Sequence, residues 1–113
     1  MLTGHYTEVE AEVPTLAGAR ATIRWLISKR HGAPHFAMRL IEIAEPGGAI
    51  PLHSHDYEHE IFVLEGSGRL LEPEGARGLI PGDFVYIEPG EEHGFENAGK
   101  TPFRFICVIP DPS

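Results

Sequence analysis

Turns rich in glycine and proline cut this chain into short segments. The 113 residues include 13 glycines and 10 prolines, and clear turns occur at Glu45–Gly48, Gly66–Gly68, Pro81–Asp83 and Glu88–Gly90. Both residue types interrupt helices, and segments of about four to eight residues between such turns are typical of strands. The spacing predicts an all-β domain of roughly nine or ten short strands, with no helix, closed into a barrel or jelly roll.

Alternation of apolar and polar residues places the first strand at Ala19–Ser28, with Ile23 and Trp25 on one face. Apolar residues fill both faces of the run Glu60–Glu65, so this strand needs cover from another sheet or a partner subunit. Residues 1–18 are polar and predict an arm or edge segment within a single domain, 1–113. The other predicted strands are His35–Ala44, Ile50–His55, Arg69–Glu72, Ala76–Ile80, Phe84–Ile87, His93–Asn97 and Phe103–Ile109.

The acidic balance of the chain argues against two classes of partner. A formal net charge of -8 does not suit nucleic acid or an anionic membrane surface, since both require a basic footprint. Cys107 is the only cysteine, so an internal disulfide is impossible and a reducing compartment fits. No signal-peptide pattern and no apolar run of membrane-spanning length is present, so we expect a cytoplasmic protein.

Four of the seven histidines form a pattern that indicates a metal site. His53 and His55 are two residues apart on a strand and therefore share a face. His59 follows a short polar turn, and His93 comes from a separate strand. Imidazole suits Mn, Fe, Ni, Cu and Zn, so the ligand type does not select the ion. The alternative is that these four histidines cluster by chance. His5, His31 and His35 are interpreted as polar surface residues.

Four neutral imidazoles would leave the full charge on a divalent ion, which favours an anionic substrate or neighbouring group. A tetrahedral ion would be closed and structural, whereas a six-coordinate ion would keep two open positions. The nearby acidic residues are interpreted as solvated residues at the rim of the site, and Glu60 is the exception that could act as a ligand or a base. Cys107 is interpreted as a buried apolar residue rather than a nucleophile. No catalytic residue is identified, and no organic cofactor motif is present.

At these residues the chain resembles the cupin superfamily. The first cupin motif is Gly, five residues, His-x-His, and it falls here on Gly47, His53 and His55. The position that usually carries Glu is His59, because six residues separate it from Gly66 and only five separate Glu60 from Gly66. The second motif keeps its spacing at Gly82, His93 and Asn97, although Pro89-Gly90 has slid within the turn.

This resemblance implies a cupin jelly roll over residues 36–110, with His53, His55, His59 and His93 as metal ligands. More narrowly, the chain is similar to a subgroup of small four-histidine cupins that bind manganese and form homodimers. This similarity implies a homodimer with one metal ion per chain, for which Mn is favoured, Fe is next, and Zn, Ni or Cu are further options.

The function so implied is a metal-dependent oxygenase of dioxygenase type acting on a small apolar or aromatic molecule. The alternatives are a non-catalytic metal-dependent ligand-binding module and a metal-dependent isomerase or lyase. By strand parity Phe95 should line the cavity, and Phe105 and Cys107 should share an inward face; Arg39 is a candidate for holding an anionic group.

Overall fold

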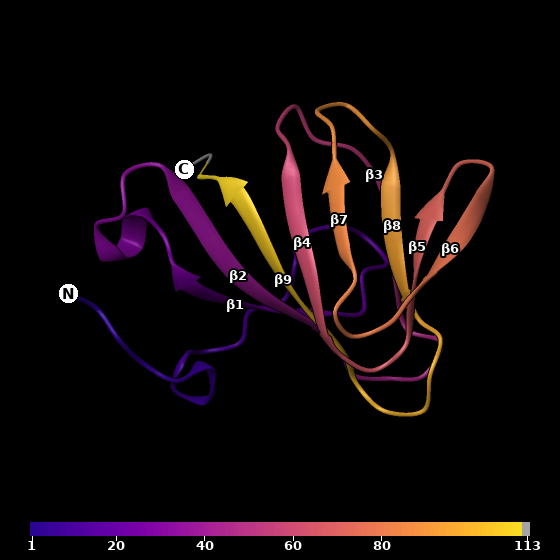
Figure 1. The fold of residues 1–113 in the computed structure, drawn as a ribbon, viewed down its shortest axis with the longest axis horizontal. Helices are drawn as coiled ribbons and strands as arrows, with labels where there is room; N and C mark the ends of the chain where they lie inside the picture. The colour runs from indigo at the N-terminus through magenta and orange to yellow at the C-terminus, as the bar shows by residue number, and fades with distance from the viewer. Residues whose placement is uncertain (112–113) are drawn as a thin grey trace.

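The computed structural model describes residues 1–111, which form two antiparallel β-sheets that face each other (Figure 1). Residues 112 and 113 of the predicted domain lie outside the described residues. Among residues 1–111 the only helical elements are two single 3-10 turns, η1 (Tyr6–Glu8) and η2 (Lys29–His31). The strands are β1 (Thr22–Ile27), β2 (Phe36–Ile43), β3 (Ala49–His53), β4 (His59–Glu65), β5 (Gly68–Glu72), β6 (Gly75–Leu79), β7 (Phe84–Ile87), β8 (His93–Asn97) and β9 (Phe103–Pro110). The predicted all-β jelly roll is confirmed.

The strands do not lie in the order in which they occur along the chain. The first sheet has the order β1-β2-β9-β4-β7, and the second has the order β3-β8-β5-β6. The last strand, β9, therefore lies between β2 and β4, and Cys107 is paired with both Arg39 and Ile61. In the second sheet β3 pairs with β8 so that His53 lies opposite His93. These two pairings position the side chains described below.

The core fills the space between the two sheets. Strict alternation along β9 turns Phe103, Phe105, Cys107 and Ile109 inward, and each is at most 1% exposed. Val63 of β4 and Ile43 of β2 are also fully buried. Burial of aliphatic and aromatic side chains is the main favourable term in folding, so this layer fixes the sheets that carry the site.

The outer face of β4 is also apolar, as the sequence predicted, but it lies at the surface of the single chain. Phe62 and Leu64 are 48% and 42% exposed, whereas Ile61 and Val63 on the opposite face are buried. Phe84 and Tyr86 of the neighbouring strand β7 are exposed beside them. Cover of this face by a partner subunit stays a prediction.

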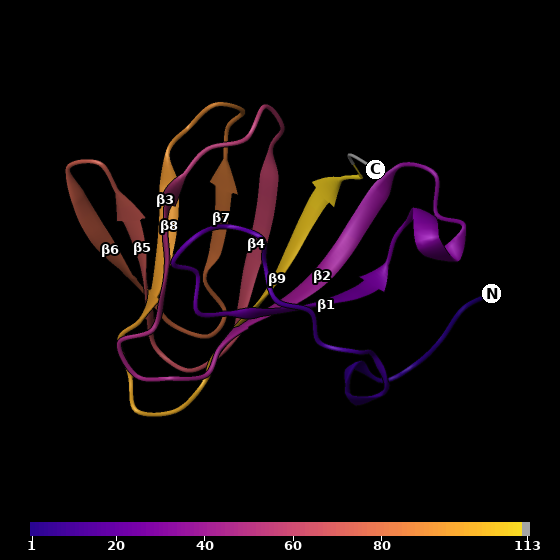
Figure 2. The ribbon, with the colours of Figure 1, turned by 180° about the vertical axis from the view of Figure 1, so that it is seen from behind.

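The N-terminal arm crosses from the first sheet toward the second (Figure 2). A single β-bridge joins Glu12 to Ile23 of β1, and the backbone N–H of Arg20 donates to the carbonyl of Ala49 in β3. The arm therefore spans the opening between the two sheets on one side. No helix in the described part of the chain has the length and apolar character needed to cross a membrane.

Candidate metal centre

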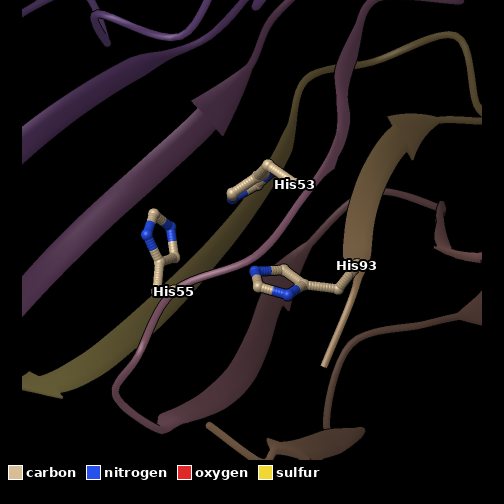
Figure 3. Close-up of side chains that lie close together, drawn as sticks. All are labelled: His53, His55 and His93. Carbon is tan, nitrogen blue, oxygen red and sulfur yellow. The ribbon is translucent and has the colours of Figure 1, made fainter. Parts of the chain in front are cut away.

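Three imidazoles converge at one end of the second sheet (Figure 3). His53 ends β3, His93 begins β8, and the register of these strands brings their ring centroids to 4.4 Å. His55 follows β3 in the next turn, with its ring centroid 4.8 Å from that of His53. One ring nitrogen from each of the three histidines lies within 4.8 Å of the others. This group could hold a metal ion.

His59 lies beside this group, at the start of β4. Its ring centroid is 4.9 Å from that of His93 and 5.1 Å from that of His55. The side chain is 4% exposed, its Nδ1 is 3.3 Å from Cys107 Sγ, and its Nε2 is buried without a hydrogen-bond partner. Buried polar atoms are nearly always satisfied. A metal ion would satisfy Nε2, so the residues present fit such an ion.

Backbone carbonyls set the tautomers of two histidines. His53 Nδ1 is 2.8 Å from the carbonyl oxygen of Pro51, and His93 Nδ1 is 2.8 Å from that of Glu91. A carbonyl only accepts, so each Nδ1–H donates and each Nε2 keeps its lone pair for an ion. Such hydrogen bonds from the other ring nitrogen are a regular feature of histidines that bind metals.

Burial favours the neutral form of three of these histidines. It lowers the pKa of His55 to about 4 and that of His59 to about 3, with the neighbouring histidines adding to the effect. Burial also lowers the pKa of His93, against an opposing hydrogen bond to the backbone of Glu91. Metal ions bind neutral imidazole, so at neutral pH these ligands need not release a proton.

Close contact between β3 and β8 depends on Gly94, the residue after His93. A Cβ at Gly94 would lie 2.5 Å from the carbonyl oxygen of Ile50. Glu60, the acidic residue singled out from the sequence, is exposed and follows the inward-facing His59 on β4. By position Glu60 therefore faces away from the cluster.

A cavity of about 590 Å³ opens beside the cluster, and His53, His55 and His59 line it. Much of the remaining wall is apolar: Trp25, Ile41, Ile50 and Phe95. The arm closes one side through residues 12–17. The cavity is large enough for a small organic molecule and lies directly on the histidines.

The structure places most of the predicted cavity residues in this wall. Arg39, Phe95 and Cys107 line the cavity. Phe105 does share the inward face of β9 with Cys107, but it lies behind Phe95, with ring centroids 4.7 Å apart, and is not part of the lining. Phe105 is fully buried and contacts both Phe95 and Phe103, so it belongs to the core between the sheets.

Sequence reasoning missed three parts of the lining. Trp25 and Ile23 both line the cavity. The sequence placed them on one face of a strand, and that shared face was the signal that could have assigned them to the lining. Tyr57 stacks on His55, with centroids 4.8 Å apart and planes inclined by 11°. Burial raises the pKa of Tyr57, so its hydroxyl remains a donor at neutral pH. The arm carries no periodic pattern that would have placed it here.

Solved structures of two bacterial proteins resemble the whole fold. The polyketide cyclase RemF from Streptomyces resistomycificus is 39% identical, with a TM-score of 0.90 over 97% of this chain and 79% of that one. A predicted oxalate decarboxylase from Thermotoga maritima is 25% identical, with a TM-score of 0.81 over 96% of this chain and 98% of that one.

Curated relatives match a shorter stretch. An oxalate-binding protein of Thermotoga maritima is 35% identical over 65 residues, covering 57% of this chain and 54% of that protein. An (R)-mandelonitrile lyase of Granulicella tundricola is 31% identical over 65 residues, 57% of this chain and 50% of the lyase. The chain thus spans about half the length of these relatives. The profile of the Cupin domain family matches residues 40–109. The chain belongs to the cupin family.

Proposed function

We propose that this protein is a metal-dependent cyclase that acts on a polycarbonyl substrate of the polyketide type. The observation that carries the proposal is that three of the four histidines, His53, His55 and His59, line a largely apolar cavity of about 590 Å³. The likeness to a polyketide cyclase over 97% of the chain supports the class of substrate. A flexible chain of carbonyl groups could fold against such a wall with an oxygen turned toward the histidines.

In our proposal His53, His55, His59 and His93 hold one divalent ion. When bound, that ion would supply Lewis acidity toward carbonyl oxygens, strengthened because neutral imidazoles leave its full charge. We also propose that the chain is a member of the four-histidine manganese subgroup. The ligands themselves do not select the ion, because imidazole binds Mn, Fe or Zn alike. The unpartnered Nε2 of His59 supports a fourth imidazole beyond the group of three.

The reaction we propose is an intramolecular aldol condensation with no net oxidation. A carbon–carbon bond forms between the methylene carbon flanked by two carbonyls and the carbon of a third carbonyl. One methylene proton passes to the oxygen of the third carbonyl, which becomes a hydroxyl. That hydroxyl and the second methylene proton then leave as water, and the new bond becomes a carbon–carbon double bond. The apolar wall excludes bulk water and holds the two carbons together, which removes much of the entropic barrier. Tyr57, whose hydroxyl stays protonated, can donate a hydrogen bond to a carbonyl oxygen.

The dioxygenase expected from the sequence is the second candidate, and the same donor set supports it. A cluster of imidazoles beside an apolar cavity also suits an oxygen-activating metal. The two candidates differ in atom balance: cyclisation loses water and consumes no oxygen, whereas the oxygenase incorporates oxygen atoms into the product.

The test uses the full chain loaded with Mn or Zn and a synthetic linear triketone, incubated under nitrogen and under air. Mass spectrometry and an oxygen electrode follow the reaction. We expect loss of one water per substrate at equal rates in both atmospheres, with Glu60→Ala as an active control. Product that forms only in air and gains oxygen would replace the cyclase by the oxygenase. Binding without turnover would leave a ligand-binding module.

A further inference from the structure

Arg39 is a buried cation on the wall of the cavity. It lies on β2, is 8% exposed, and belongs to the cavity lining. Its Nη2 donates to Cys107 Sγ at 3.0 Å, and its Nε is buried without a partner. Among residues 1–111 no carboxylate forms an ion pair with it. A buried charge normally has an anionic partner, because desolvation without one is costly.

A second arginine in the same cavity provides a contrast. Arg30 lies over Trp25, with its guanidinium carbon 4.9 Å from the ring centroid, and Arg39 lies 5.4 Å from the same ring. Arg30 donates to both carboxylate oxygens of Glu12, at 2.6 and 3.3 Å, and is therefore neutralised. Arg39 has only the neutral thiol of Cys107 and the ring of Trp25. The charged lining therefore carries one uncompensated positive charge, apart from any metal.

Cys107 links this charge to the histidine cluster. The Cys107 sulfur contacts Arg39 Nη2 on one side and His59 Nδ1 on the other. Strand register fixes the arrangement, since Arg39 of β2 and Ile61 of β4 both pair with Cys107 of β9. The guanidinium is therefore held in place by Trp25 and Cys107, and its Nε–H is left as an unpaired donor.

We propose that Arg39 binds an anionic oxygen of the substrate, either a carboxylate or an ionised enol, beside the histidine cluster. A guanidinium edge matches such oxygens with two parallel N–H donors, and a buried site strengthens each of these hydrogen bonds. The inference refines the proposed function by naming a group that the substrate carries. Arg39 thereby acts as a residue that determines specificity.

Three small probes test this without turnover: benzoate as a carboxylate, dimedone as an ionised enol, and benzamide as the neutral counterpart of benzoate. Binding to the metal-free full chain is measured by calorimetry, with the fluorescence of Trp25, the only tryptophan, as a second readout. We expect Arg39→Gln to lower the affinity for benzoate and dimedone by about tenfold or more, and to change the affinity for benzamide by less than about twofold. Arg39→Lys should recover part of the loss, because it restores the charge but not the planar fork.

The double variant Arg69→Gln/Glu96→Gln is the matched control, because it removes an arginine–carboxylate pair outside the cavity lining without changing net charge. It should leave all three affinities unchanged. If Arg39→Gln loses affinity for dimedone alone, Arg39 binds an ionised enol; if it loses affinity for benzoate alone, Arg39 binds a carboxylate. Either result supports the proposal.

The proposal is overturned if wild-type protein binds benzoate and dimedone no more tightly than benzamide, a comparison that needs no variant to fold. It is also overturned if Arg39→Gln weakens benzamide as much as benzoate, or leaves both anions unaffected. A chain that binds these anions through Arg39 but cyclises nothing would refute only the cyclase.

Discussion

Gly94→Ala tests whether the close approach of β3 and β8 holds the metal centre together. The new Cβ would lie 2.5 Å from the carbonyl oxygen of Ile50 and 3.1 Å from the backbone nitrogen of Leu52. These are backbone atoms, so the strands must separate by about 0.5–1 Å to restore normal contact. Overpacking of this kind costs about 1–3 kcal/mol, and the reduced freedom of the unfolded chain returns only about 0.4–1 kcal/mol.

The separation would also pull apart the pair His53 and His93, whose rings are 4.4 Å apart in the opposed register. We therefore expect Gly94→Ala to lose stability and, in addition, to lose about 10–100-fold in metal affinity, as when the support of a ligand is disturbed. Urea unfolding of the metal-free protein gives the first quantity. Competition with a chromophoric chelator for zinc gives the second.

Gly78→Ala is the control, because it places the same methyl group on another strand of the same sheet. A Cβ at Gly78 would meet no atom within 4 Å. This variant should match the wild type or gain about 0.4–1 kcal/mol, with unchanged metal affinity. If Gly94→Ala proves as stable as Gly78→Ala and binds zinc equally well, the argument from strand contact is refuted.

Two further predictions concern the histidines. His59→Ala should weaken zinc binding strongly while Glu60→Ala should not, because His59 is buried beside the cluster and Glu60 is exposed; equal losses in a chelator competition would contradict the fourth ligand. The metal-free protein should become less stable as pH falls from about 6.5 toward 4. In the unfolded chain His55 and His59 are protonated near their ordinary pKa of 6.5, whereas in the folded protein their pKa values are about 4 and about 3. Urea unfolding at pH 7 and pH 5 should differ by on the order of 1 kcal/mol, allowing for screening by solvent, and a flat profile would show that burial does not hold these imidazoles neutral.

Much of the fold could be predicted because its local signals agree with one another. The strand Phe84–Ile87 has the bounds expected from the sequence, since Pro81–Asp83 and Glu88–Gly90 limit it on both sides. The motif spacing also indicated which histidines would share a region. Strand order could not be derived from periodicity, because pairing β9 between β2 and β4 depends on contacts between residues distant in the chain.

The cavity was harder to predict than the cluster. Alternation tells which residues share a face of one strand, and this was enough to turn Phe95 and Cys107 inward. It does not tell how deep along a strand the core ends and the cavity begins, which is why Phe105 lies behind Phe95 rather than on the wall. The arm is polar and irregular, so only its bridge to Ile23 and its packing in three dimensions make it part of the wall.

The central place of β9 has a consequence for how the protein is made. Arg39 and Cys107 are paired neighbours in the sheet but are 68 residues apart in sequence. While the chain emerges from the ribosome, the edges of β2 and β4 that pair with β9 have no partner until β9 has been synthesised. Long-range pairing of this kind makes folding slow and leaves such edges open to aggregation. The first sheet can therefore be completed only after β9 has left the ribosome.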